Sequence, residues 1–121
     1  MSIFSLTGTP YDFRRYNCWH HVRRTRALCG LETPLFDVSS PSDIPDAFDR
    51  GHNDPKGLSR HDVPADFDVV LMGSVIGSRV VWHAGVYYQG YVSHCARQEK
   101  QVKLENIDDL ARTYSRLEFW R

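Results

Sequence analysis

Residues 80–94 read Val-Val-Trp-His-Ala-Gly-Val-Tyr-Tyr-Gln-Gly-Tyr-Val-Ser-His, two strand-like runs joined by a Gln-Gly pair. A two-residue connection between such runs is typical of a tight β-hairpin. In that register Gly85 falls opposite His94. Because alternate side chains along a strand share a face, His83 and His94 become diagonal neighbours on one face, with space between them at Gly85. A shift of one residue would move His94 to the other face, so the prediction depends on the loop length.

Residues 16–22 read Tyr-Asn-Cys-Trp-His-His-Val and are typical of a helix start. Asn17 is a favourable N-cap residue, so Cys18 is expected at the first helical position. Gly30 is expected to end the helix, because glycine tolerates the left-handed conformation found there. The spacing of apolar and small residues predicts that one helical face carries Cys18, Val22, Thr25 and Cys29.

The remaining sequence predicts an α+β fold in one domain, residues 1–121. Residues 31–66 contain five prolines and are expected to be mostly loop, with a short helix possible at 42–50. After this segment the pattern favours an antiparallel β-meander that packs on the first helix. Strands are expected at 67–72 (closed by Gly73), 80–88, 91–95, 101–104 and 117–121, with a short helix at 107–114 capped by Asn106.

The composition excludes several classes of protein. The 121 residues include 15 basic and 15 acidic side chains, and zero formal charge argues against a protein that grips nucleic acid by its phosphates. No stretch approaches the roughly 18 apolar residues of a membrane helix, and the N-terminal residues do not resemble a signal peptide. Three cysteines do not make a paired disulfide framework, so synthesis in a reducing cytosol is expected. Ligand spacings typical of zinc sites are missing from the sequence, so neither a metal nor another cofactor is expected.

Cys18 and His83 together indicate chemistry. A thiol at a helix N-terminus experiences partial positive charge, which is expected to lower its pKa and favour the thiolate. An imidazole on an adjacent strand can take the thiol proton, and a third polar group, here His94, can hold that imidazole in the right tautomer. The backbone N–H of Cys18 could donate to a developing oxyanion. The other cysteines, Cys29 and Cys95, are expected to be core residues, and the histidines that follow the nucleophile, His20 and His21, to be structural or solvated.

Five short segments, in this order, resemble the NlpC-type cell-wall peptidases. They are Gly-Thr-Pro-Tyr at 8–11, Tyr-Asn-Cys-Trp at 16–19, Asp-Val-Val-Leu-Met at 68–72, His-Ala-Gly-Val-Tyr at 83–87 and Ser-His-Cys-Ala at 93–96. The resemblance covers most of the chain and is weak between residues 31 and 66. The sequence departs from the family pattern at Asn17, usually Asp, at Trp19-His20, usually Ser-Gly, and at Ala84, usually Val.

The resemblance implies a papain-like fold and a cysteine endopeptidase that hydrolyses peptidoglycan stem peptides. Cys18 matches the family nucleophile, His83 the general base and His94 the orienting residue. Tyr11 matches a tyrosine whose hydroxyl lies beside the nucleophile. The aromatic-Asn-Cys-Trp start and the Phe-Trp-Arg at 119–121 are most similar to the branch encoded with bacteriophage tail-tip genes. This branch implies a virion protein made in the host cytoplasm, with tail-tip proteins as partners.

Two other functions remain open at this point. A tail-tip subunit could keep the fold as a non-catalytic assembly or plug module, and the proline-rich segment would suit partner contacts. An amidase or another acyl-transfer enzyme could use the same thiol on a different substrate. The related lipid acyltransferases usually carry His before Cys, whereas here Cys18 precedes His83, which argues against them.

Overall fold

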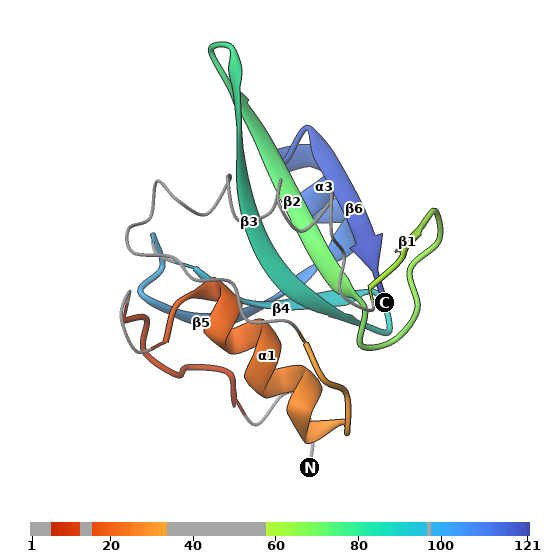
Figure 1. The fold of residues 1–121 in the computed structure, drawn as a ribbon. Helices are drawn as coiled ribbons and strands as arrows, with labels where there is room; N and C mark the ends of the chain where they lie inside the picture. The colour runs from red at the N-terminus through yellow and green to blue at the C-terminus, as the bar shows by residue number, and fades with distance from the viewer. Residues whose placement is uncertain (1–5, 13–15, 34–57, 97) are drawn as a thin grey trace.

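The computed structural model describes residues 6–12, 16–33, 58–96 and 98–121. One helix, α1, packs against a six-stranded antiparallel sheet of strand order β1-β6-β2-β3-β4-β5, with the short helix α3 between its last two strands in sequence (Figure 1). The predicted α+β layout is therefore confirmed. The elements are α1 (Cys18–Leu28), β1 (Arg60–His61), β2 (Val69–Ile76), β3 (Arg79–Tyr88), β4 (Tyr91–Ala96), β5 (Gln101–Asn106), α3 (Ile107–Thr113) and β6 (Arg116–Trp120).

The strands do not form the simple meander that the sequence predicts. Strands β2 to β5 follow one another, but β6 returns across the sheet to pair with β2, with Phe119 opposite Val70 and Leu117 opposite Met72. The connection from β5 to β6 crosses the sheet and contains α3, whose Leu110 packs with Val70 and Met72 in one apolar cluster. Burial of that cluster favours placing β6 beside β2 instead of beside β5.

The start and the end of α1 are confirmed. The Asn17 side-chain oxygen accepts hydrogen bonds from the N–H groups of Trp19 and His20, each at 3.0 Å. Past the last turn, Gly30 has a φ of 76°, and the Leu31 N–H donates to the carbonyl of Arg26 at 2.9 Å. Both caps satisfy backbone groups that a helix terminus leaves open. They fix Cys18 as the first residue of the helix.

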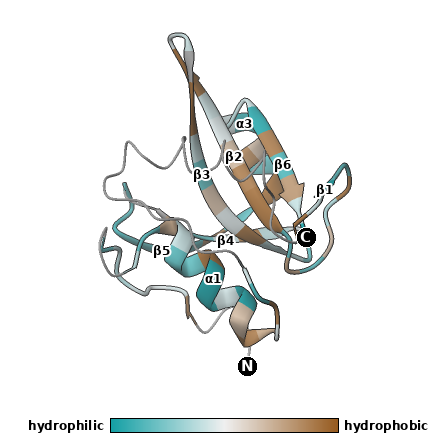
Figure 2. Ribbon diagram, viewed as in Figure 1, coloured by the Kyte–Doolittle hydropathy of each residue, from teal (hydrophilic) through white to brown (hydrophobic). Residues whose placement is uncertain are grey.

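Apolar residues fill both sides of the sheet. On the α1 side, the buried cluster contains Cys18, Trp19 and Val22 from the helix and Val69, Leu71, Trp82, Ala84 and Val86 from β2 and β3. On the α3 side, the cluster contains Val70, Met72, Val92 and Leu110. In Figure 2 hydrophobic residues recur along the strands, whereas α1 carries many hydrophilic ones. Side chains along β2 alternate between the two clusters, as expected when both faces of a strand are buried.

The strand predicted at 67–72 is longer than expected and does not stop at Gly73. Strand β2 continues to Ile76, and Gly73 lies opposite Trp82 on β3. A Cβ added at Gly73 would lie 2.9 Å from Cζ3 of Trp82, so the indole ring occupies the space above the glycine. This contact lets the strand pass through a glycine that the sequence pattern interprets as a stop.

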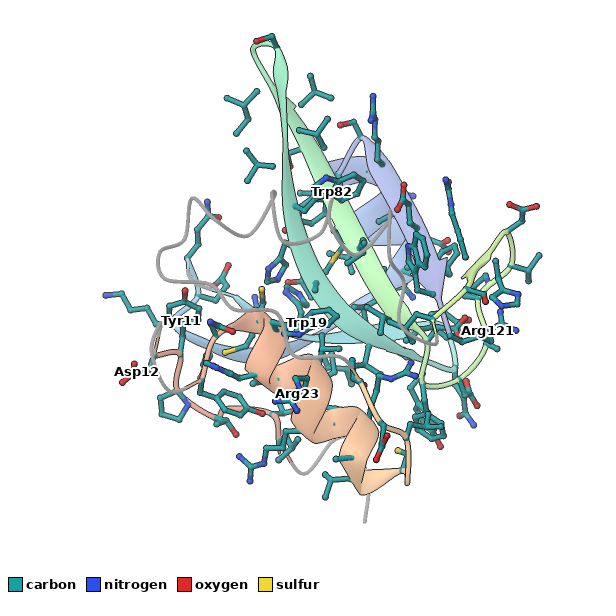
Figure 3. All side chains as sticks on the ribbon, viewed as in Figure 1. Tyr11, Asp12, Trp19, Arg23, Trp82 and Arg121 are labelled. Carbon is teal, nitrogen blue, oxygen red and sulfur yellow. The ribbon has the colours of Figure 1, made fainter. Side chains whose placement is uncertain are left out.

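Of the proline-rich segment, residues 34–57 lie outside the described residues, and so does the helix considered at 42–50. The described part of that segment adds the two-residue strand β1, which pairs with the end of β6. Nearby, the buried Asp68 carboxylate lies 2.9 Å from the Nε of Arg121, a residue that Figure 3 shows beside β1. Within the described ranges, no helix is both long and apolar enough to cross a membrane.

Candidate active site

The predicted hairpin register is confirmed. Tyr88 pairs with Tyr91 and Val86 with Ser93, as a two-residue loop requires. As a result, Nε2 of His83 lies 2.8 Å from Nδ1 of His94, and the two rings meet at 75°. Because Nε2 of His83 makes this contact, Nδ1 is the ring nitrogen that remains for another partner.

Gly85 makes this contact sterically possible. A Cβ at this position would lie 2.6 Å from Cγ1 of Val92, 2.9 Å from the carbonyl oxygen of Ser93 and 3.0 Å from Cβ of His94. The first two distances are shorter than a real Cβ tolerates, and one of them is to backbone. Because Gly85 and Val92 are fully packed between strands, β4 would have to move away from β3.

We expect Gly85→Ala to destabilise the fold by about 1–3 kcal/mol, the usual range for overpacking a core. Urea unfolding of the purified variant measures this loss. Gly77→Ala provides a contrast, since its added Cβ has no atom within 4 Å and only its positive φ of 63° is unfavourable. If Gly85→Ala were as stable as the natural chain, the close packing of β4 against β3 would be wrong.

A third residue, Glu105, extends the histidine pair. Its Oε1 lies 3.1 Å from Nε2 of His94. In the β4–β5 register His94 is opposite Lys103 and Val92 is opposite Glu105, which makes Glu105 a diagonal neighbour of His94 on the same face. The sequence analysis did not identify Glu105. Finding it requires the β4–β5 register, which depends on the connection after β4, and a strand that extends beyond the predicted 101–104.

Cys18 lies at the start of α1, packed against β3. Its side chain is 4% exposed and belongs to the apolar cluster with Trp82 and Ala84. Burial raises the pKa of the thiol to about 11, while backbone N–H groups, that of Ala84 foremost, act in the opposite direction. The expectation of a lowered thiol pKa is therefore wrong for this state, because loss of solvation outweighs the helix N-terminus.

The backbone of Ala84 interacts with the Cys18 thiol, and His83 is the residue before Ala84 in sequence. His83 is paired with Met72 of the α3-side cluster, so its side chain leaves β3 on the face opposite to that of Ala84. Burial, together with the charges of the nearby His94 and His21, lowers the pKa of His83 to about 3. At neutral pH the two groups are therefore a neutral thiol and a neutral imidazole. A thiolate–imidazolium pair forms only where each charge stabilises the other, since burial disfavours either charge alone.

A second buried network joins α1 to β4. His21 is fully buried, with Nδ1 2.7 Å from the Tyr16 hydroxyl and Nε2 2.8 Å from the Ser93 hydroxyl. Burial lowers its pKa to about 4. Ser93 precedes His94, so β4 contacts α1 through one residue and the His83 ring through the next. His21 is therefore buried and hydrogen-bonded instead of solvated.

Tyr11 lies in the segment before α1. Its N–H donates to the carbonyl of Lys100 at 2.9 Å, and paired hydrogen bonds between Asp12 and Tyr16 turn the chain toward the helix. Figure 3 shows Tyr11 on the same side of the molecule as the N-terminal end of α1. Its predicted role beside the nucleophile remains a prediction.

The other singled-out residues have structural contacts. Nδ1 of His20 accepts the Asn17 N–H at 3.1 Å and completes the capping box of α1. Cys95 is fully buried, as expected, and its thiol donates to the Tyr16 carbonyl. Cys29 is only partly buried, because it is the C-cap residue of α1 and lies beyond the packed face. The sequence analysis missed Tyr114, whose ring stacks on His83 with centroids 6.5 Å apart.

No protein-family model matches the sequence, and no curated protein is significantly similar to it. Among the described residues, no three His, Cys, Asp or Glu side chains are grouped so that they could hold a metal ion. The argument for function therefore comes from the site geometry and from the sequence resemblance.

Proposed function

We propose that the protein is a cysteine peptidase in which Cys18 is the nucleophile, His83 the general base and His94 the residue that orients it. The hydrogen bond of 2.8 Å between His83 and His94 carries this proposal. It engages one nitrogen of His83 and supports a free lone pair on the other. Cys18 begins α1 and packs against Ala84, the residue after His83. The approach of the thiol to the His83 imidazole is part of the proposal.

The reaction follows from these groups. Nδ1 of His83 takes the thiol proton as the Cys18 sulfur attacks a peptide carbonyl carbon, and a C–S bond forms. The tetrahedral intermediate collapses, the C–N bond breaks, and the leaving amine takes the proton from His83. Water then attacks the thioester with His83 as base, and the C–S bond breaks to release a carboxylic acid and the thiol.

The neutral resting pair has a consequence for this reaction. Burial opposes a standing thiolate, so proton transfer accompanies attack instead of preceding it. Helix N-terminal N–H groups, and Tyr11 as the resemblance implies, would stabilise the oxyanion. Before substrate binds, the orientation of the His83 ring by His94 therefore matters more for the reaction than a charge on Cys18 or His83.

The resemblance to NlpC-type enzymes supplies the substrate class. It favours the stem peptides of peptidoglycan, with a place in a bacteriophage tail tip and a role in opening the wall during DNA delivery. The chain shows no wall-binding repeat in its sequence, so partner tail proteins would bring the domain to its substrate.

Mass spectrometry of purified sacculi incubated with the protein tests this proposal. A peptidase releases fragments with new amino and carboxyl ends inside the stem peptide. Release of intact stem peptides from the glycan would identify an amidase instead. Unchanged sacculi would contradict both enzymatic functions.

One observation favours a second candidate, a non-catalytic tail-tip subunit that retains the fold. Cys18 is 4% exposed and its pKa is raised to about 11, which is typical of a structural cysteine. Under this alternative the chain would bind partner tail proteins and leave sacculi intact, and Cys18→Ala would assemble normally.

A further inference from the structure

We propose that Glu105 is a positioning residue that fixes the tautomers of His94 and His83, so that the basic nitrogen of His83 is the one left for Cys18. This inference rests on the proposed function and adds a fourth residue to the site. The chain of contacts is continuous: Glu105 Oε1 to His94 Nε2 at 3.1 Å, then His94 Nδ1 to His83 Nε2 at 2.8 Å.

The direction of each hydrogen bond follows from Glu105. A carboxylate has only acceptor oxygens, so His94 must donate to it through Nε2–H. His94 is 3% exposed, and burial lowers its pKa below the ordinary value although Glu105 acts in the opposite direction. In the neutral ring that burial favours, the lone pair is on Nδ1. That lone pair can only accept, so His83 donates through Nε2–H. A neutral His83 then has its own lone pair on Nδ1.

Without Glu105, Nε2 of His94 loses the acceptor that holds its proton. His94 could then carry its proton on Nδ1 and donate to His83, which would place the His83 proton on Nδ1 and remove the base. A histidine held in the wrong tautomer loses most of its activity as a base. The carboxylate also favours the imidazolium that forms when His83 takes the thiol proton.

Other charged and titratable groups face this part of the site, and any pH dependence includes them. Lys103 on β5 is opposite His94, with its Nζ 3.6 Å from Glu99 and 3.9 Å from Glu105. The charges of Lys103 and Glu99 act on His94, and His21 acts on His83. Tyr114 is influenced by Glu105. Glu99 contacts the same lysine and acts on His94 only through its charge, which makes it the matched control.

The test is the rate of iodoacetamide alkylation at Cys18, measured by peptide mass spectrometry between pH 6 and pH 10. It needs no substrate. We expect Glu105→Ala to lower the rate at neutral pH about tenfold, the smaller effect seen when the partner of a histidine is removed. Throughout this pH range its rate should stay below that of the natural chain, because the imidazolium loses a favourable charge. Glu105→Gln keeps an oxygen acceptor and should retain the rate within about threefold. Glu99→Ala should match the natural chain.

The outcomes separate the two proposals. A rate that falls in His83→Gln but not in Glu105→Ala would overturn the role of Glu105 and leave the Cys18–His83 pair standing. A rate that His83→Gln does not change would overturn both. Equal losses in Glu105→Gln and Glu105→Ala, with circular dichroism unchanged, would show that the acceptor oxygen does not matter and would also overturn the tautomer role.

Discussion

Replacing His83 with glutamine is expected to lower the rate of stem-peptide cleavage by about 100- to 10,000-fold, the range for loss of a general base. Glutamine can still donate to Nδ1 of His94, so the contact between β3 and β4 can persist. It cannot take the thiol proton. The loss should therefore be in the rate of the chemical step, measured by quantitative mass spectrometry of released fragments.

His61→Gln is the matched control, because His61 is a partly exposed residue of the short strand β1 at the far end of the sheet from β4. It should cleave at the natural rate. Thermal unfolding of both variants checks that the fold is intact. Cleavage by His83→Gln at the rate of the control would remove His83 from the mechanism.

Low pH is expected to destabilise the fold strongly, because the buried histidines are harder to protonate in the folded protein than in the unfolded chain. The pKa of His21 is lowered to about 4 and that of His83 to about 3, against an ordinary value of 6.5. The unfolded chain therefore binds more protons below about pH 6.5. Stability is fully present above that pH and falls as the pH decreases toward 4. His21 alone contributes a loss of about 3 kcal/mol between pH 7.5 and pH 4.

Urea unfolding at the two pH values measures this loss. His21→Gln removes the titrating ring while keeping polar atoms near the Tyr16 and Ser93 hydroxyls, so its free energy of unfolding should depend less on pH by about 3 kcal/mol. The control is again His61→Gln, at the partly exposed residue of strand β1. An unchanged pH dependence in His21→Gln would contradict the burial of a neutral His21.

The parts of the structure that could be predicted are those set by local sequence. Asn17 and Gly30 bound α1 because caps depend on a few adjacent residues. The Gln-Gly turn sets the β3–β4 register, and this register alone brings His83 to His94. The return of β6 to β2 could not be predicted, since it depends on the apolar cluster around Leu110, far from β2 in sequence. Continuation of β2 through Gly73 depends on Trp82 in the same way.

The sequence predicts the helix start at Cys18 and the contact between His83 and His94, but not the electrostatics of these groups. The sequence places Cys18 at a helix N-terminus, where a lowered pKa is the general expectation. Its protonation depends instead on burial among residues of β3, which no local pattern reveals. Glu105 was missed because the β4–β5 register depends on the connection after β4, where Lys100 adopts a φ of 61°.

The central claim is that Cys18 is the nucleophile for cleavage of peptidoglycan stem peptides. The most direct measurement compares sacculi digested by the natural chain, by Cys18→Ala and by Cys29→Ala, with all soluble fragments identified by mass spectrometry. Cys29 is the partly buried C-cap residue of α1 and serves as the control thiol. The account predicts new stem-peptide fragments from the natural chain and Cys29→Ala, and none from Cys18→Ala. Equal cleavage by all three proteins, or fragments from none of them, would contradict it.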